Sequence, residues 1–76
     1  MIKMTVGKTY CGLTDDPIQR KQQHGNPRDW STISLPNEDS ARAWERKMLN
    51  MGYEGGTGGG GWRYGYTYTI TAYTTE

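Results

Sequence analysis

The sequence predicts a small α+β domain, in which two helices pack on a mainly antiparallel sheet of three or four strands. Two observations lead to this fold class. Segments with the apolar–polar alternation of strands occur near both ends of the chain and in its middle. Between them lie two segments that carry helix start and stop signals. A chain of 76 residues is expected to form one domain, spanning 1–76.

The composition indicates a core that relies on aromatic side chains. Only 33% of the residues are hydrophobic and Phe is absent, but the chain has six Tyr and three Trp, each with a large apolar surface and a polar group. A net charge of +1 argues against a surface that binds nucleic acid by charge alone. Cys11 is the only cysteine, which excludes an internal disulfide and disfavours a cysteine-based metal site. Without a secretory signal or a membrane-length apolar run, we expect a soluble, cytoplasmic protein with no membrane partner.

The N-terminal segment predicts a hairpin of two short strands. Residues Ile2–Val6 lean apolar, Gly7 and Lys8 provide turn chemistry, and Thr9–Leu13 form the second strand. The first strand must be very short because so few residues precede the turn.

A short polar helix is predicted next. Asp15 or Asp16 supplies the N-cap oxygen, and Pro17 occupies the first turn, where its missing N–H costs nothing. The helix is expected to run to His24, where a glycine follows and ends it. Ile18 is its only apolar anchor.

The middle of the chain predicts a strand and then the strongest helix. Residues 30–35, WSTISL, alternate like a half-buried strand that Pro36 ends. The helix is expected to begin at Asn37 or Asp39 and to end at Met51, with acidic residues in its first turn and a glycine directly after it.

One face of this second helix is apolar but contains a carboxylate. At about 100° per residue the apolar arc spans roughly 160°, and its members are Ala41, Trp44, Met48, Leu49 and Met51. Glu45 lies inside this arc, whereas the other charged residues from Arg42 onward project away from it. Two explanations are open: a side chain that reaches out from the edge and pairs with Arg42, or a carboxylate placed there for function.

The C-terminal third predicts a flexible loop followed by a strand. Residues 52–61, GYEGGTGGGG, match G-x-G-x-x-G formally, but they lack the preceding strand and following helix of a phosphate-binding loop. Residues 62–73 alternate strictly and predict the clearest strand of the chain. Its aromatic face is either core or a platform on which nucleic-acid bases stack, and it comprises Trp62, Tyr64, Tyr66, Tyr68 and Ile70.

Three side chains around the first helix suggest phosphate chemistry. Arg20 and His24 lie one turn apart on the same helix face, and Tyr10 lies just before the turn that begins the helix. An arginine binds phosphate oxygens through two parallel hydrogen bonds. The structural alternative is a solvated helix face whose imidazole lies near the last helix carbonyls.

The stretch GKTYCGLTDDPIQRKQQH resembles the second half of the GIY-YIG nuclease signature. That signature has Tyr-x-Gly on a strand, a Thr two residues later, and a helix with Arg and then His; the matching residues are Tyr10, Gly12, Thr14, Arg20 and His24. The family next has a strand and a helix that carries one metal-binding glutamate among apolar residues, and Glu45 fits that place. The resemblance covers residues 7–51 and implies a GIY-YIG-like fold.

The resemblance implies metal-dependent hydrolysis of a nucleic-acid phosphodiester, with DNA favoured over RNA. Glu45 would hold Mg²⁺ or Mn²⁺, which would stabilise the leaving oxygen. Arg20 would stabilise charge on the phosphoryl group, and Tyr10, with or without His24, would orient or deprotonate the attacking water. A tyrosine with an ordinary pKa of about 10 is a poor base at neutral pH, so its pKa would have to be lowered.

The family's first motif, Gly-Ile-Tyr on a strand that precedes the second motif, is absent because Tyr10 lies too near Met1. We therefore expect the C-terminal stretch GYTYTI, residues 65–70, to pair beside the N-terminal strands. There it would supply the second active-site tyrosine, Tyr66 or Tyr68.

Two other functions fit the same residues. A domain without the first motif could keep the fold as a catalytically degenerate module that binds nucleic acid or a partner protein. In the third interpretation the chain is a small structural or accessory protein, in which Arg20 and Glu45 form a salt bridge under the sheet. The sequence leaves the oligomeric state open.

Overall fold

The computed structural model describes residues 6–55 and 61–74 of the chain. In chain order, its elements are β1 (Thr9–Thr14), α1 (Pro17–Gln23), β2 (Ser31–Ser34), α2 (Glu38–Asn50) and β3 (Tyr64–Thr69). The fold is a small α+β arrangement of two helices and a three-stranded antiparallel sheet, as the sequence predicts. Neither helix of this described part is long and apolar enough to cross a membrane.

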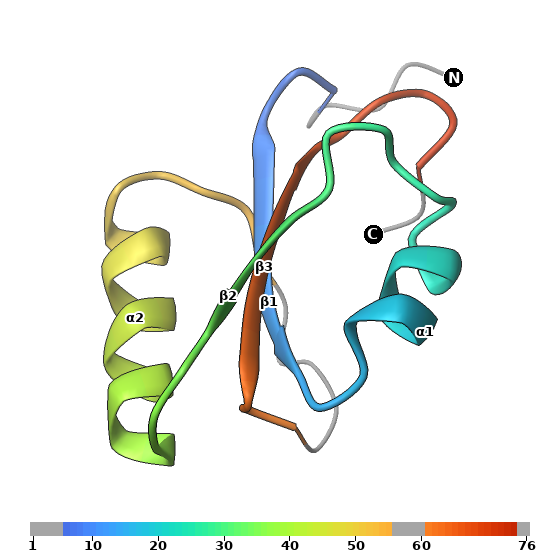
Figure 1. The fold of residues 1–76 in the computed structure, drawn as a ribbon. Helices are drawn as coiled ribbons and strands as arrows, with labels where there is room; N and C mark the ends of the chain where they lie inside the picture. Colours follow the sequence, from blue (N-terminus) through green and yellow to red (C-terminus); the bar gives the residue numbers. More distant parts are fainter. Residues whose placement is uncertain (1–5, 56–60, 75–76) are drawn as a thin grey trace.

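The last strand of the chain is the central strand of the sheet. The strand order is β1-β3-β2, and β3 pairs antiparallel with both neighbours (Figure 1). In this register Tyr10 lies opposite Tyr68 and Gly12 lies opposite Tyr66. The C-terminal strand therefore pairs beside β1, where the sequence comparison with the nuclease signature predicts it.

The predicted N-terminal partner of β1, Ile2–Val6, lies outside the described residues except for Val6. The described residues of the predicted turn bond to β3 instead. Gly7 donates its N–H to the Ile70 carbonyl at 2.8 Å, and Ile70 donates to the Lys8 carbonyl at 2.8 Å. These two bonds hold the segment before β1 against the residue that follows β3.

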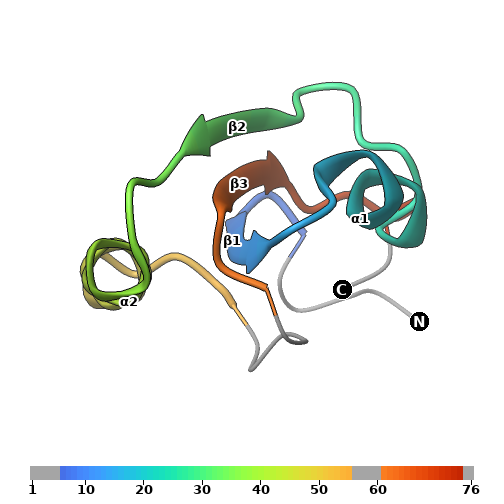
Figure 2. The same cartoon turned by 60° about the horizontal axis from the view of Figure 1, so that its bottom comes forward.

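The two helices cover opposite faces of the sheet (Figure 2). On the α2 face, Cys11 and Leu13 of β1 and Ala41 of α2 are buried. A Cβ at Gly65 would lie 2.8 Å from ring atoms of Trp44, so the glycine lets this indole lie directly on β3. Hydrocarbon and close backbone contact thus hold this face together.

Helix α1 is attached to its face of the sheet differently from the sequence prediction. Its bounds agree with the prediction, but it has no buried residue, and its expected apolar anchor Ile18 is 74% exposed. The residue that follows it, His24, is only 6% exposed. The anchor of α1 is therefore an imidazole, because the sheet face below it presents tyrosine hydroxyls with which a ring nitrogen can bond.

Two neighbouring aspartates that the sequence could not separate have different tasks. Asp16 is the N-cap of α1 and accepts the Gln19 N–H at 3.1 Å. Asp15 accepts the N–H groups of Trp62 and Arg63 at 3.1 and 3.2 Å, which lowers its pKa and ties the start of β3 to the end of β1. Asp15 is thus a tether between two strands.

Helix α2 begins where the sequence predicts, with the Asn37 side chain accepting the Ser40 N–H at 2.7 Å. The predicted apolar stripe faces the sheet, but its C-terminal part is open: Leu49 is 42% and Met51 60% exposed. A domain of this size has too little sheet to cover the whole stripe.

The predicted loop at 52–61 is described only in part, because residues 56–60 lie outside the described residues. Gly52, with φ +95°, ends α2. Glu54 then pairs with the outer edge of β1: its N–H donates to the Thr9 carbonyl at 2.9 Å, and its carbonyl accepts from Cys11 at 2.8 Å. The described start of this segment is thus fixed to the sheet.

Candidate functional site

Three tyrosines of two paired strands lie together on the α1 face. Side chains alternate along each strand, so Tyr10 of β1 and Tyr66 and Tyr68 of β3 point to the same side. The Tyr10 ring centroid lies 5.3 Å from that of Tyr68 and 6.4 Å from that of Tyr66. The nuclease resemblance predicts that Tyr10 and one of the two β3 tyrosines share a site, and both β3 tyrosines lie next to Tyr10.

His24 lies between two of these tyrosines at the end of α1. Its backbone N–H bonds to the Arg20 carbonyl at 3.0 Å and so ends the helix. The imidazole Nε2 lies 2.9 Å from the Tyr66 hydroxyl, and Nδ1 lies 2.9 Å from the Tyr68 hydroxyl. Both ring nitrogens are thus used on tyrosines, so the interpretation of the imidazole as a cap on the last helix carbonyls is wrong.

Trp30, just before β2, completes this group. Its indole stacks on Tyr66 with centroids 4.5 Å apart and an interplanar angle of 21°. It also lies 5.8 Å from Tyr68 and 6.3 Å from His24. We call these five residues, Tyr10, His24, Trp30, Tyr66 and Tyr68, the aromatic cluster. Sequence reasoning placed Trp30 only at the start of a strand, since no short-range pattern links it to a helix that precedes it.

The burial of the aromatic cluster settles the two interpretations of the β3 aromatic face. Tyr66 is 3% and Tyr68 1% exposed. Neither ring offers a face on which a base can stack, so the stacking platform is wrong for these two residues and the core interpretation is correct. Arg63, which is exposed and directly precedes β3, lies 5.8 Å from the centroid of the Trp62 ring.

Gly12 makes room for Tyr66. A Cβ built at Gly12 would overlap the hydroxyl end of the Tyr66 ring, which crosses β1 at this residue. Any other amino acid at this position would push the phenol away from His24. The Tyr-x-Gly pattern of β1 therefore has a physical reason: only a glycine leaves room on β1 for the ring of a tyrosine from β3.

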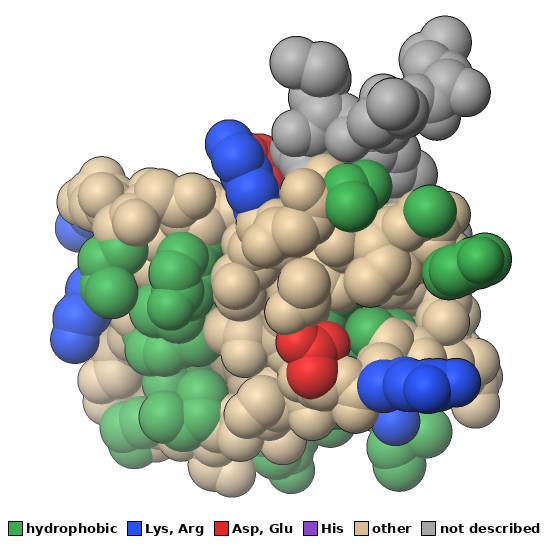
Figure 3. All heavy atoms as spheres, turned by 90° about the horizontal axis from the view of Figure 1, so that it is seen from above, with side chains coloured by type: hydrophobic (Ala, Val, Ile, Leu, Met, Phe, Trp, Pro, Cys, Tyr) green, Lys and Arg blue, Asp and Glu red, His purple; other side chains and the backbone are tan. Residues whose placement is uncertain are grey.

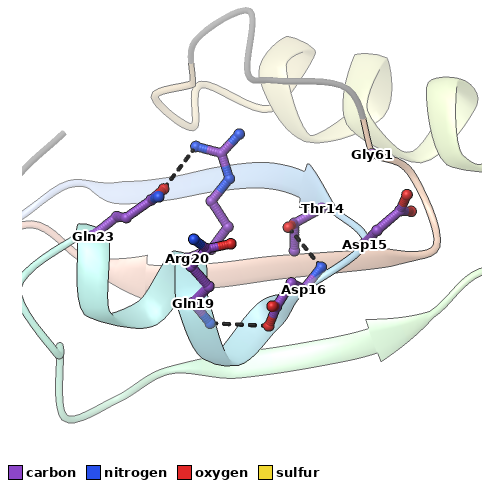
Figure 4. Close-up of a pocket in the computed structure, with 7 residues that line it drawn as sticks. All are labelled: Thr14, Asp15, Asp16, Gln19, Arg20, Gln23 and Gly61. Atoms are coloured by element: carbon purple, nitrogen blue, oxygen red, sulfur yellow. Dashed lines mark hydrogen bonds between the residues drawn. The ribbon is translucent and has the colours of Figure 1, made fainter.

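Arg20 borders a separate pocket at the start of α1. The pocket has a volume of about 260 Å³ and is lined by Thr14, Asp15, Asp16, Gln19, Arg20, Gln23 and Gly61. Figure 4 shows the Arg20 guanidinium projecting from α1 beside Gln23, whose Oε1 accepts a hydrogen bond from Nη1 at 3.3 Å. Thr14 accepts the Asp16 N–H at 3.0 Å and so helps to shape the turn into the helix.

Charged side chains of both helices act on the Tyr66 hydroxyl. The pKa of Tyr66 is raised to about 12, mainly by burial and next by the nearby Tyr10. Arg20 has a smaller, lowering effect on this pKa, and Glu45 has a small raising effect. Arg20 of α1 and Glu45 of α2 therefore lie within electrostatic reach of one phenol. Because Tyr66 keeps its proton at neutral pH, it is a poor base.

Glu45 lies on the α2 side of the sheet. Its side chain is 22% exposed and pairs with Arg42 at 3.9 Å, as the first of the two explanations from the sequence predicts. Burial, and next Glu45, raise the pKa of the Cys11 thiol to about 11, which places the carboxylate near this buried cysteine. Among the described residues, no ion pair joins Glu45 to Arg20, so the salt bridge that the third interpretation expects under the sheet is not found there.

A metal ion bound at Glu45 would have few protein ligands. Within the two described ranges, 6–55 and 61–74, no group of three or more His, Cys, Asp or Glu side chains could hold a metal ion. Mg²⁺ is commonly bound by one or two carboxylates, with water and substrate phosphate as its other ligands. A single glutamate fits Mg²⁺ or Mn²⁺ in this way and does not fit Zn²⁺, which takes several nitrogen or sulfur ligands.

Comparison with protein-family models, with curated proteins and with solved structures finds no match to this chain.

Proposed function

We propose that this domain binds nucleic acid, DNA ahead of RNA, and hydrolyses a phosphodiester bond with the help of a divalent metal ion. One observation carries the proposal. The strand that comes last in the chain lies directly beside β1, so that Tyr68 faces Tyr10 and both tyrosines of β3 surround His24. This pairing supports the idea that β3 supplies the tyrosine that the nuclease signature carries on a strand ahead of Tyr-x-Gly.

In the proposed site, the role of each side chain follows from whether it is exposed enough to contact substrate. Arg20, half-buried at the rim of its pocket, binds the phosphate that is attacked. Tyr10 is half-buried as well and orients the attacking water. His24 and the two β3 tyrosines are buried and hold Tyr10 in place by ring contacts. Glu45 lies on the α2 side of the sheet, so a metal ion held there would have to act across the edge strand β1 from Arg20. The electrostatic influence of both residues on the Tyr66 hydroxyl supports this arrangement, in which the ion would stabilise charge at the leaving oxygen.

A second function is favoured by the burial of the aromatic cluster. Three of its members are less than 10% exposed, and the pKa of Tyr66 is raised rather than lowered. Such a cluster suits a domain that keeps Arg20 for phosphate contact and has lost turnover. This candidate is a nucleic-acid-binding module without catalysis.

Cleavage assays with matched variants separate the two functions. Supercoiled DNA, single-stranded DNA and RNA are incubated with the protein in Mg²⁺ or Mn²⁺, and with Arg20→Ala and Glu45→Ala. Arg46→Ala and Glu38→Ala serve as charge-matched controls, because both side chains are exposed on α2. The nuclease predicts cleavage that both site variants reduce by about 100-fold or more and that neither control changes.

Other outcomes have equally definite meanings. Binding without cleavage that is weakened only by Arg20→Ala supports the binding module and contradicts the nuclease. Absence of both binding and cleavage contradicts both functions. Cleavage that survives Glu45→Ala at full rate shows a contaminating nuclease or another metal site, and the proposed role of Glu45 is then wrong.

A further inference from the structure

We infer that Tyr66 is a positioning residue that fixes the protonation pattern of His24. In this pattern Tyr66 donates its hydroxyl proton to Nε2, and the ring carries its own proton on Nδ1 and donates it to the Tyr68 oxygen. The inference selects Tyr68 over Tyr66 as the partner of Tyr10. Its catalytic meaning rests on the proposed function, whereas the hydrogen-bond pattern itself does not.

The first step follows from the two contacts of the ring. Nε2 and Nδ1 each lie 2.9 Å from a tyrosine hydroxyl. A neutral imidazole has one N–H donor and one bare nitrogen that accepts. One tyrosine must therefore donate to His24 and the other must accept from it.

The second step follows from the surroundings of Tyr66. Within the described part of the chain, its hydroxyl makes one hydrogen bond, to His24, and the residue is 3% exposed. If Nε2 carried the proton and donated it to Tyr66, the phenol proton would have no acceptor among residues 6–55 and 61–74. A buried donor without a partner is costly, so Tyr66 donates and Nε2 accepts.

Two further facts agree with this direction. Burial raises the pKa of Tyr66 to about 12, so at neutral pH the phenol has a proton to give. A doubly protonated ring would also donate from Nε2 and would leave the same phenol proton without an acceptor. Because Gly12 has no side chain, the hydroxyl end of Tyr66 lies over β1, where it contacts the His24 imidazole.

The consequence falls on Tyr68. With Nε2 occupied as an acceptor, neutral His24 carries its proton on Nδ1, 2.9 Å from the Tyr68 oxygen. In this pattern the Tyr68 oxygen accepts a hydrogen bond from His24, whereas the Tyr66 hydroxyl donates one to it. Tyr68 also lies opposite Tyr10 in the strand register. In the proposed site Tyr10 and Tyr68 thus form the working pair, and Tyr66 supports them through His24.

Nuclear magnetic resonance of the histidine ring tests this pattern directly. His24 is the only histidine, so the ring signals of the ¹⁵N-labelled protein do not overlap. Long-range ¹H–¹⁵N correlations, recorded above the ordinary histidine pKa of about 6.5, identify which nitrogen carries the proton. We expect Nδ1 protonated and Nε2 bare. A wild-type ring protonated on Nε2, or on both nitrogens, overturns the inference whatever any variant does.

Three phenylalanine variants separate positioning from packing. Tyr66→Phe removes the donor but keeps the ring, so the Nε2-protonated form should appear and the ¹⁵N shifts should move toward each other. Tyr68→Phe should leave the wild-type tautomer, because Tyr66 still donates. Tyr64→Phe, on the same face of β3 and without a side-chain hydrogen bond in the described residues, should also leave it.

Each alternative result contradicts the inference. If Tyr68→Phe changes the tautomer and Tyr66→Phe does not, the two tyrosines have the reverse roles. Equal changes in both variants show that ring packing, not donation from Tyr66, sets the tautomer. If Tyr66→Phe does not fold, the wild-type spectrum alone decides.

The spectra are recorded without nucleic acid, so they test the hydrogen-bond pattern of His24 independently of the proposed function. A protein that cleaves nothing but shows the expected tautomer refutes the nuclease alone. A protein that cleaves DNA but carries its ring proton on Nε2 refutes the role of Tyr66 alone.

Discussion

The two faces of the sheet are closed by different forces. On the α2 face, buried side chains are Cys11, Leu13 and Ala41, and Trp44 lies on Gly65. On the α1 face, an imidazole bonds to two tyrosine hydroxyls and is surrounded by aromatic rings that are tilted against it. Burial of hydrocarbon is non-directional, whereas each hydrogen bond of the aromatic cluster fixes a donor and an acceptor in one geometry.

This difference shows where a small domain can place chemistry. The α2 face supplies stability through contacts that tolerate small shifts of the side chains. The polar groups of the α1 face are buried, so each of their hydrogen bonds is stronger than in water and the loss of a partner costs more stability. Arg20 and Tyr10 border this second face, so they are attached to the more rigidly specified half of the molecule.

The largest effect is expected from His24→Ala. This change leaves the Tyr66 and Tyr68 hydroxyls without their imidazole partner and removes the one buried anchor of α1. We expect a loss of about 3–5 kcal/mol in the free energy of unfolding, measured by urea denaturation. Gln23→Ala, at the neighbouring exposed residue, should change it by less than about 0.5 kcal/mol. A loss below 1 kcal/mol for His24→Ala would mean that other contacts hold α1.

A matched pair of glycine substitutions compares the two faces directly. Gly12→Ala puts a methyl group into the seat of the Tyr66 phenol, and Gly65→Ala puts one against the Trp44 ring at 2.8 Å. Tyr66 is buried and bonded to His24, while Trp44 is half-buried and can shift toward solvent. Gly12→Ala should therefore destabilise by about 2–3 kcal/mol and Gly65→Ala by about 1 kcal/mol in chemical denaturation. Equal losses would show that the α1 face is no more specific than the α2 face.

The smallest effect is expected from Glu45→Leu, which replaces the one carboxylate of the α2 stripe by hydrocarbon. Glu45 is 22% exposed and its ion pair with the exposed Arg42 is long, at 3.9 Å. Thermal denaturation should show a stabilisation of about 0.5–1 kcal/mol. Glu38→Leu is the control, because Glu38 also pairs with Arg42 but is 57% exposed. A destabilised Glu45→Leu protein would indicate that the carboxylate is there for structure.

The local signals of the sequence predict most of the fold. Both helices and all three strands follow from turn residues and from the periodicity of apolar side chains. The N-caps Asp16 and Asn37 are each one of two helix starts that the sequence leaves open. The central place of β3 does not follow from the local signals, because strand order depends on contacts between residues far apart in the chain. The resemblance alone predicts that β3 pairs beside β1, because it requires a second tyrosine there, and nothing predicts that β2 pairs with the other edge of β3.

The candidate site could be predicted in part for the same reason. Tyr10, Gly12, Arg20 and His24 occur within one short stretch, so their spacing is visible in the sequence. The two tyrosine partners of His24 follow it by 42 and 44 residues in the sequence, so no local pattern predicts them. The contacts of Trp30 with Tyr66 and of Asp15 with the start of β3 are not predicted either, because they depend on how the sheet closes.

A titration of the labelled protein with nucleic acid tests most directly whether the α1 face is the functional face. Single-stranded and duplex DNA are added in turn to ¹⁵N-labelled protein with Mg²⁺, and the amide and histidine-ring signals are followed. Binding at the proposed site predicts the largest shifts at Tyr10, Arg20 and the His24 ring, and little change along the exposed side of α2. Shifts confined to the exposed side of α2, or no shifts at millimolar DNA, would contradict it.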